Sequence, residues 1–250
     1  MKLKGKAAII TGAGQGIGKA IALSYAKEGA NLSLNVYGLD EERVKLLVKE
    51  LTDFDVQVIV TEGDITDEKI VKELVTNTMN AYGRIDILVN NAGILTQSLI
   101  QDMSVEMWDR MIEVDLKSVF LTTRQVVPYM ISQKSGRIIN TASQLGQKGG
   151  VELSHYAAAK AGVIGFTKSI ALELGKYGIT ANCIAPGPIE TELVAGINEE
   201  WKIQKRSELA IPRFGKAEEV APTAVLLASD PDGNIYTGQT LGPNSGDVMI

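Results

Sequence analysis

Residues 7–27 read AAIITGAGQGIGKAIALSYAK, and this stretch decides the fold. The apolar run Ala7–Ile10 leads into a glycine-rich turn over residues 12–18, after which apolar residues recur at helical spacing. The order strand, turn, helix predicts a βα unit. Glycine lets a backbone approach a phosphate closely, and a helix N-terminus offers free N–H groups to an anion. The stretch therefore predicts a dinucleotide-binding turn, although its glycine spacing departs from the standard fingerprint.

The same alternation continues along the chain. Short apolar runs alternate with stretches of helical periodicity, and several runs are continuously apolar, as in parallel sheets covered on both faces. The predicted strands are Ala7–Ile10, Leu32–Val36, Val56–Val60, Ile85–Val89, Arg137–Asn140, Thr180–Ile184 and Gln239–Leu241. We therefore predict an α/β fold, in which residues 1–250 form a single doubly wound, Rossmann-type domain with a parallel sheet and helices on both faces.

Composition excludes several classes of function. The net charge of -5 lacks the basic footprint of a nucleic-acid-binding protein. The single cysteine, Cys183, cannot form an internal disulfide, and together with one histidine it cannot build a typical zinc site. The apolar run near the N-terminus is too short for a signal peptide or a membrane span. We expect a cytoplasmic protein without a metal, a nucleic-acid partner or a membrane anchor.

Two further motifs follow later strands. Asn90-Asn91-Ala92-Gly93 ends the fourth predicted strand, and Ser143 precedes Tyr156-Ala-Ala-Ala-Lys160. With the glycine turn, these motifs resemble the classical short-chain dehydrogenase/reductase family over essentially the whole chain. The resemblance implies an NAD(P)H-dependent oxidoreductase that interconverts a secondary alcohol and a ketone. It also implies that the family usually assembles as dimers or tetramers, here through helices near residues 101–130 and 157–177.

The Tyr156–Lys160 pair has a physical rationale of its own. Residues four apart share one face of a helix, so the phenol and the ammonium can address one site. A free phenol has a pKa of about 10, and a nearby ammonium lowers the pKa of a phenol. The pair can then exchange a proton with an alcohol or a carbonyl, while Ser143 stabilises the charge on the reacting oxygen. The alternative is an ordinary pair on a solvated helix.

The resemblance also implies the cofactor contacts. Asp64 could instead cap a helix, and Pro186-Gly187 is a good turn by itself. The implied contacts are Gly12, Gln15, Gly16, Ile17, Gly18, Asp64, Ile65, Asn91, Ala92, Gly93, Tyr156, Lys160, Pro186, Gly187, Ile189 and Thr191.

The chain departs from the family pattern at two places. Asp115 stands where the family has a catalytic asparagine, whose backbone carbonyl holds a water on the proton path. We assign Asp115 that role, with a carboxylate that either tunes Lys160 or is a structural variant. At the end of the second predicted strand, residues 35–38 contain neither the acid typical of NAD binding nor a base, and the turn carries Gln15. The lack of a carboxylate favours NADP.

The substrate is less defined. Residues 190–212 are expected to form a movable lid. Predicted pocket residues are Leu95, Gln144, Leu145, Val151, Leu153 and Val194. They suit a modest, partly apolar alcohol or ketone. His155, adjacent to Tyr156, is expected to point away from the Tyr156 face as a loop or pocket-edge residue.

The nearest resemblance within the family is to 3-oxoacyl-acyl-carrier-protein reductases, through INTAS, YAAAKAG, GFTKS and APGPIETE. Such enzymes dock an acyl carrier protein through basic residues. Lys134 occupies one of these positions, whereas Tyr177 replaces the other. A sugar, polyol or small-alcohol dehydrogenase is the enzyme alternative. A cofactor-sensing protein is the alternative from another class, although such proteins tend to lose the Tyr–Lys pair.

Overall fold

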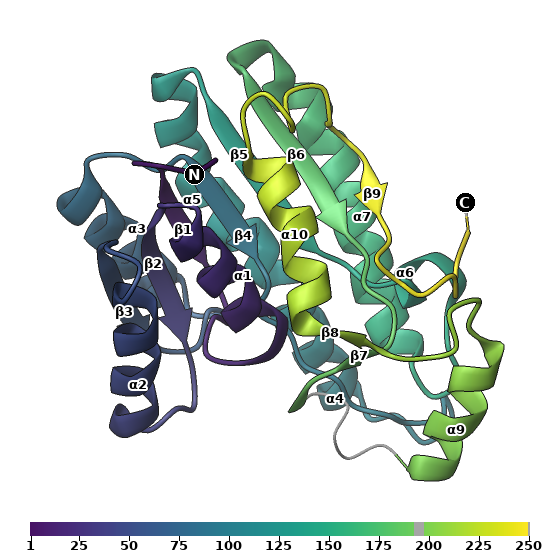
Figure 1. Cartoon of the computed structure of the whole chain (residues 1–250). Helices are drawn as coiled ribbons and strands as arrows, with labels where there is room; N and C mark the ends of the chain where they lie inside the picture. Colours follow the sequence, from purple (N-terminus) through teal and green to yellow (C-terminus); the bar gives the residue numbers. More distant parts are fainter. Residues whose placement is uncertain (193–197, 250) are drawn as a thin grey trace.

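The computed structural model describes residues 1–192 and 198–249. Its main feature is a sheet of seven parallel strands in the order β3-β2-β1-β4-β5-β6-β9 (Figure 1). The strands are β1 (Ala7–Ile10), β2 (Asn31–Val36), β3 (Val58–Glu62), β4 (Ile87–Asn90), β5 (Gly136–Thr141), β6 (Ile179–Ile184) and β9 (Thr240–Leu241). All seven predicted strands are confirmed, with ends that shift by at most a few residues.

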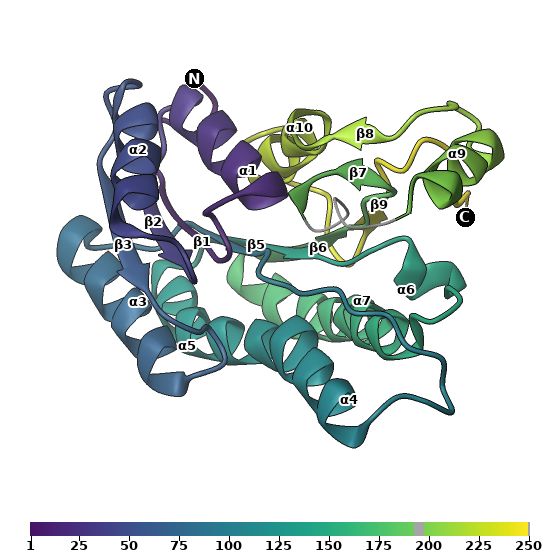
Figure 2. The same ribbon diagram turned by 90° about the horizontal axis from the view of Figure 1, so that it is seen from below.

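Helices cover both faces of this sheet, as predicted (Figure 2). One face carries α1 (Gly16–Lys27), α2 (Glu41–Thr52) and α10 (Ala217–Ala228), and the other carries α3 (Glu68–Tyr82), α5 (Ser118–Gln133) and α7 (Ser154–Leu174). Successive residues of β1 point to opposite faces, so Ile9 packs with the α3, α5 and α7 side and Ile10 with the α1 and α10 side. Within the described residues, no helix is long and apolar enough to cross a membrane.

The strand order identifies the end of the sheet at which a ligand is expected to bind. β1 pairs with β2 on one side and with β4 on the other, so the chain reverses direction across the sheet between β1 and β4. In doubly wound sheets, ligands bind at the carboxyl ends of the strands at this reversal. The glycine turn after β1 and the Asn90–Gly93 segment after β4 meet there: a Cβ on Gly12 would lie 2.8 Å from the Cα of Ala92.

Two strand boundaries differ from the predictions because side chains take over the backbone hydrogen bonds. Ile85 is buried, but its N–H donates to the Gln133 side chain and its carbonyl accepts from the same amide, so β4 begins only at Ile87. Likewise the N–H of Gln239 donates to the Asn182 side chain, and β9 begins at Thr240.

Several short elements escaped the sequence patterns. β7 (Ile189–Glu190) pairs with β8 (Gly215–Lys216), and two-residue strands carry no periodicity. Between α4 (Val105–Ile112) and α5 lies η1 (Glu113–Lys117), a π-helical turn of a kind that often marks functional sites. The other short elements are α6 (Leu145–Lys148), η2 (Gly175–Tyr177) and α9 (Glu199–Glu208).

Candidate active site

A cleft of about 640 Å³ opens at the carboxyl ends of the strands. Within the described part of the chain it brings together nearly every residue that the sequence singled out. From that set it is lined by Gly12, Gln15, Gly16, Ile17, Asp64, Ile65, Asn91, Ala92, Gly93, Leu95, Asp115, Ser143, Gln144, Leu145, Val151, Leu153, Tyr156, Lys160, Pro186, Gly187, Ile189 and Thr191. Val194 lies outside the described residues. Gly18 lies behind the turn rather than on the cleft wall.

The glycine turn is shaped by close backbone packing. Gly12 and Gly16 have φ values of +61° and +53°, which favour glycine. A Cβ on Gly18 would lie 2.2 Å from the carbonyl oxygen of Gly12 and 2.5 Å from Nδ2 of Asn91. Asn91 donates from that amide to the Thr11 and Gly12 carbonyls. Thus Asn91 supports the turn, and helix α1 begins there without a side-chain cap, leaving N–H groups free for an anion.

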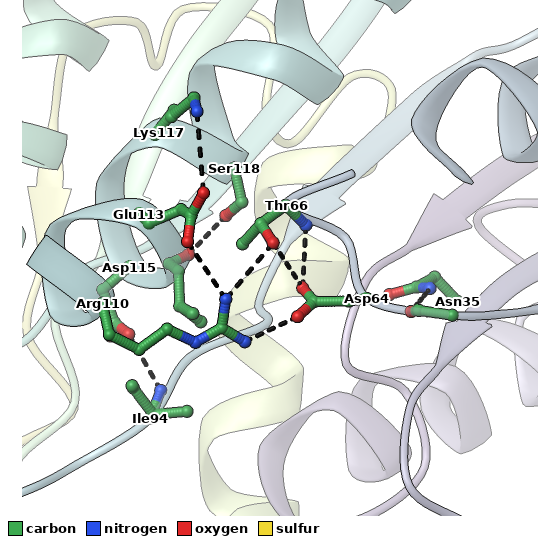
Figure 3. A network of polar contacts seen from close by, with 11 residues as sticks. Asn35, Asp64, Thr66, Ile94, Arg110, Glu113, Asp115, Lys117 and Ser118 are labelled. Atoms are coloured by element: carbon green, nitrogen blue, oxygen red, sulfur yellow. Dashed lines mark hydrogen bonds and ion pairs between the residues drawn. The ribbon is translucent and has the colours of Figure 1, made fainter. Parts of the chain in front are cut away.

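Asp64 does not cap a helix, because Asp67 caps α3. Instead Oδ1 of Asp64 accepts hydrogen bonds from the backbone and hydroxyl of Thr66, and Oδ2 lies 2.6 Å from Nη2 of Arg110 (Figure 3). Partial burial would raise the pKa of Asp64, but the Thr66 and Arg110 contacts outweigh it and lower that pKa. Asp64 is therefore a fixed carboxylate on the cleft wall.

Ser143, Tyr156 and Lys160 meet across two elements. Ser143 follows β5, while Tyr156 and Lys160 lie one turn apart in α7. The ammonium of Lys160 is 5.6 Å from the centre of the Tyr156 ring and donates to the carbonyl of Thr141 at 3.0 Å. The Ser143 side chain acts to lower the pKa of the Tyr156 phenol, and its hydroxyl accepts from the backbone N–H of Leu145 at 3.1 Å. All three are buried yet reach the cleft, which is the arrangement that proton exchange with a bound carbonyl needs.

Asp115 approaches this group from the π-helical turn η1. Its side chain is fully buried, Oδ1 accepts from the backbone of Ile94 at 2.8 Å, and Oδ2 lies 3.1 Å from Nζ of Lys160. Gly93 leaves room for this pair, since a Cβ there would lie 2.9 Å from Oδ2 of Asp115. The predicted proximity of Asp115 and Lys160 is present in the structure as a buried ion pair.

The electrostatics correct one expectation. The sequence predicted that Lys160 would bring the pKa of the Tyr156 phenol below its usual value, and Lys160 does act in that direction. In the structure burial dominates and raises that pKa, with Lys160 opposing and Asp115 reinforcing the rise. Burial also raises the pKa of Asp115 despite the nearby ammonium. Burial opposes the charge of Lys160, but Asp115 and Tyr156 outweigh it and raise the pKa of Lys160.

His155 points away from the Tyr156 face, as expected, but the expectation of a loop or pocket-edge position was wrong. The imidazole is fully buried in the first turn of α7, and its Nε2 lies 2.8 Å from the hydroxyl of Thr96. Burial lowers the pKa of His155, against the pull of Asp115, because it disfavours the charged ring. A neighbour of Tyr156 faces a different direction on the helix, and here that direction is the protein interior.

Sequence reasoning missed several lining residues. They share no motif and come from distant segments, so only the folded chain could reveal most of them. They include Tyr37, Gln97, Arg110, Lys148 and Phe214, whereas Lys205 and Glu208 lie in the segment predicted as the lid but were not singled out. Lys148 offered one signal, because it lies in the loop segment that Ser143 opens.

Comparisons with known proteins agree with this geometry. The short chain dehydrogenase family matches residues 6–202. The chain is 43% identical to a 3-oxoacyl-[acyl-carrier-protein] reductase FabG of Thermotoga maritima over 249 residues, covering 100% of both proteins. It is 40% identical to a 3-oxoacyl-[acyl-carrier-protein] reductase of Synechocystis over 248 residues, covering 99% of both.

Solved structures show the same likeness. Levodione reductase superposes with a TM-score of 0.91 at 34% identity, covering 98% of both chains. A short chain dehydrogenase from Burkholderia cenocepacia, in complex with NADP, gives a TM-score of 0.90 at 31% identity, covering 99% of both. The chain therefore belongs to the classical short-chain dehydrogenase/reductase family, whose members are NAD(P)-dependent oxidoreductases acting on alcohols and carbonyls.

Proposed function

We propose that this enzyme reduces the ketone of a 3-oxoacyl thioester carried by an acyl carrier protein. The observation that carries the proposal is the Ser143–Tyr156–Lys160 group on the cleft wall, in a chain similar over its full length to reductases of that name. Tyr156 donates a proton to the ketone oxygen, and Ser143 hydrogen-bonds that oxygen as negative charge develops on it. Lys160 and the carbonyl of Asp115 connect the phenol to solvent.

The residues around the turn fit a nicotinamide dinucleotide, which supplies the hydride when it is bound. The positive-φ glycines and the uncapped start of α1 form a cradle for a pyrophosphate. In this proposal Asp64 and Ile65 would contact the adenine, Gly93 and Lys160 the riboses, and Ile189 and Thr191 the carboxamide. The remaining predicted contacts, Gln15, Ile17, Ala92, Pro186 and Gly187, complete the wall.

NADP is the cofactor that we propose. No acidic side chain ends β2: the amide of Asn35 is held by the Gly63 carbonyl, Tyr37 is exposed, and Leu39 packs against Gly14. A carboxylate at this place would repel the 2′-phosphate of NADP. The solved relative from Burkholderia cenocepacia was crystallised in complex with NADP.

We propose that residues 1–250 act as one domain and that the segment 190–212 forms its lid; residues 193–197 of that segment lie outside the described part of the chain. Trp201, Lys205 and Glu208 of α9 line the cleft opposite α6, so this helix walls the substrate end. The carrier would reach the site from outside this wall.

The position of the basic residues that could dock the carrier favours an oligomer. Lys134 is exposed, and a Cβ on Gly178 would lie 2.7 Å from its carbonyl oxygen, so η2 adjoins it. The Lys176 ammonium lies 5.1 Å from the Tyr177 ring and restores a cation beside the tyrosine. This basic surface precedes β5 and β6, at the sheet end opposite the cleft. A carrier bound there would serve the cleft of another subunit.

Exposed apolar side chains offer an interface for such an assembly. Val105, Trp108, Phe120 and Leu172 are exposed large apolar residues on α4, α5 and α7, the helices that the sequence assigned to a dimer or tetramer interface. We propose a homodimer or homotetramer built through them.

Steady-state kinetics test the proposed function. We expect kcat/KM for the reduction of acetoacetyl-acyl carrier protein to be at least about tenfold higher with NADPH than with NADH. A tenfold difference requires only about 1.4 kcal/mol of preferential binding. Combining Lys134→Glu with Lys176→Glu should raise the KM for the carrier-bound substrate and leave that for an acetoacetyl-N-acetylcysteamine thioester unchanged. Turnover of hexoses or diols in place of both thioesters would support the polyol dehydrogenase alternative. Cofactor binding without any turnover would support the cofactor-sensing alternative.

Replacement of Asp115 tests its effect on the proton path. Asp115→Asn keeps an acceptor for Ile94 and removes the negative charge that raises the pKa of Tyr156. Alcohol oxidation needs the phenolate, so the rising limb of kcat/KM against pH should move to lower pH. Asp109→Asn removes the same charge from an exposed position and should leave the profile in place. An unchanged profile in Asp115→Asn would mean that the carboxylate has no part in the mechanism.

A further inference from the structure

Three charged side chains meet beside the substrate end of the cleft. Lys148 ends α6, Lys205 lies in α9, and Asp247 lies in the C-terminal tail. The two ammonium groups approach the same oxygen, Oδ1 of Asp247, at 2.6 Å and 2.7 Å. Asp247 is 5% exposed and Lys205 is 11% exposed. Removing ionised groups from water costs free energy, so this buried ion pair calls for an explanation other than keeping the protein soluble.

The two lysines line the cleft, whereas Asp247 is not among its lining residues. The carboxylate therefore lies behind the ammonium groups and holds them at the wall. An ammonium has three N–H donors, and Asp247 engages one donor of each lysine. Within residues 1–192 and 198–249, Lys148 has no other ion-pair partner, and Lys205 has one more, Glu208, at 3.1 Å. Donors remain for a ligand.

Lys205 and Asp247 stabilise each other's charged form. Burial opposes the charge of Lys205, but Asp247 and Glu208 outweigh it and raise its pKa. Burial would raise the pKa of Asp247, but the two lysines lower it. The two ammonium groups thus share one buried carboxylate, and the other acid paired with them in the described residues, Glu208, contacts Lys205 and is half exposed.

The geometry also sets a length. Lys148 lies five residues after Ser143, and residues Leu145–Lys148 form α6. At 1.5 Å of rise per residue, its backbone is roughly 8 Å from that of Ser143. A short substrate could therefore place its carbonyl at Ser143 and an anionic group at Lys148, since both residues line the same cleft.

We propose that Lys148 and Lys205 form an anion subsite, so that the preferred substrate carries a carboxylate or phosphate a few carbon atoms from its reacting carbonyl. The inference rests on the proposed function only for the place of that carbonyl at Tyr156. It adds to that function a charged substrate end that a neutral acyl chain would not use.

Matched substrates test the subsite by kinetics. Acetoacetate, 4-oxopentanoate and 5-oxohexanoate are compared with their methyl esters, and dihydroxyacetone phosphate is compared with dihydroxyacetone. We expect at least one anion to exceed its neutral partner in kcat/KM by about tenfold or more. The three acid–ester pairs measure a preference for a carboxylate, and the dihydroxyacetone pair measures a preference for a phosphate.

Variants assign the preference to the two lysines. Lys148→Met and Lys205→Met keep an apolar stem and remove the charge, so each should reduce the anion-to-neutral ratio at least about fivefold while neutral substrates change less than about twofold. Lys45→Met, on the exposed face of α2, changes the net charge equally and should alter nothing. A ratio near one in the unmodified enzyme, or a ratio that survives in the double lysine variant, would overturn the proposal.

A binding measurement separates this proposal from the proposed function. Trp201 lines the cleft with Lys205, and Trp108 is the only other tryptophan. In a Trp108→Phe background with NADPH present, titration with the keto acids should change Trp201 fluorescence, and Lys148→Met should weaken the apparent Kd about fivefold. Lysine-dependent binding without turnover would leave the subsite standing and reject the proposed reductase activity. Turnover of neutral ketones without lysine-dependent anion binding would do the reverse.

Discussion

Tyr156→Phe is expected to lower kcat for carbonyl reduction by about 10³-fold, because general acid catalysis contributes roughly 10²–10⁴-fold and the variant has no proton to give. The ring is only 8% exposed and packs beside Met111, Leu153 and Ala159, so a phenylalanine fits the same space. Cofactor binding should change little, since the Lys160 ammonium keeps its bonds to Thr141 and Asp115. Single-turnover kinetics and a cofactor fluorescence titration would measure the two effects.

Tyr25→Phe is the matched control for that experiment. The Tyr25 hydroxyl is buried and donates to the carbonyl of Ala224, between α1 and α10. Its removal should cost about 1 kcal/mol of stability and leave kcat unchanged. If Tyr156→Phe keeps a tenth or more of the original kcat, the phenol is not the proton donor.

Gly18→Ala should give the second large effect. The new methyl carbon would lie 2.2 Å from the Gly12 carbonyl oxygen and 2.5 Å from Nδ2 of Asn91, and both belong to rigid parts of the turn. Overpacking of this kind costs about 1–3 kcal/mol and displaces backbone. We expect Kd for NADPH to rise at least about tenfold and the thermal midpoint to fall.

Gly165→Ala makes the same substitution where space is open. Gly165 lies within α7, and nothing lies within 4 Å of the place its Cβ would take. Alanine in a helix is about 1 kcal/mol better than glycine, so this variant should unfold at the same or a higher temperature and bind cofactor normally. Normal NADPH affinity in Gly18→Ala would show that the turn adapts and does not depend on this contact.

Most of the fold could be predicted because each strand is a contiguous signal. Ala7–Ile10 and Thr180–Ile184 are apolar runs bounded by turn residues, and both became strands. The boundaries that moved did so through long-range contacts, such as Gln133 replacing the sheet partner of Ile85. Such contacts leave no trace in local sequence.

The candidate site likewise contains some residues that the sequence could predict and others that it could not. Ser143, Tyr156 and Lys160 were predictable because they stand at fixed spacings in one segment. Arg110, Lys205 and Asp247 come from separate segments, and only folding brings them to Asp64 and Lys148. The raised pKa of Tyr156 also depends on burial, which a spacing cannot express.

The reversal of the sheet between β1 and β4 has a consequence for engineering. The turn after β1 and the carboxyl end of β2 precede this reversal in the sequence. Ser143, Tyr156 and Lys160 all follow it. The residues proposed to select the nucleotide and those proposed to transfer the proton thus lie in successive parts of the chain. A chimaera that takes residues 1–84 from a relative with the opposite cofactor preference should inherit that preference, while the recipient's substrate range stays with the second half.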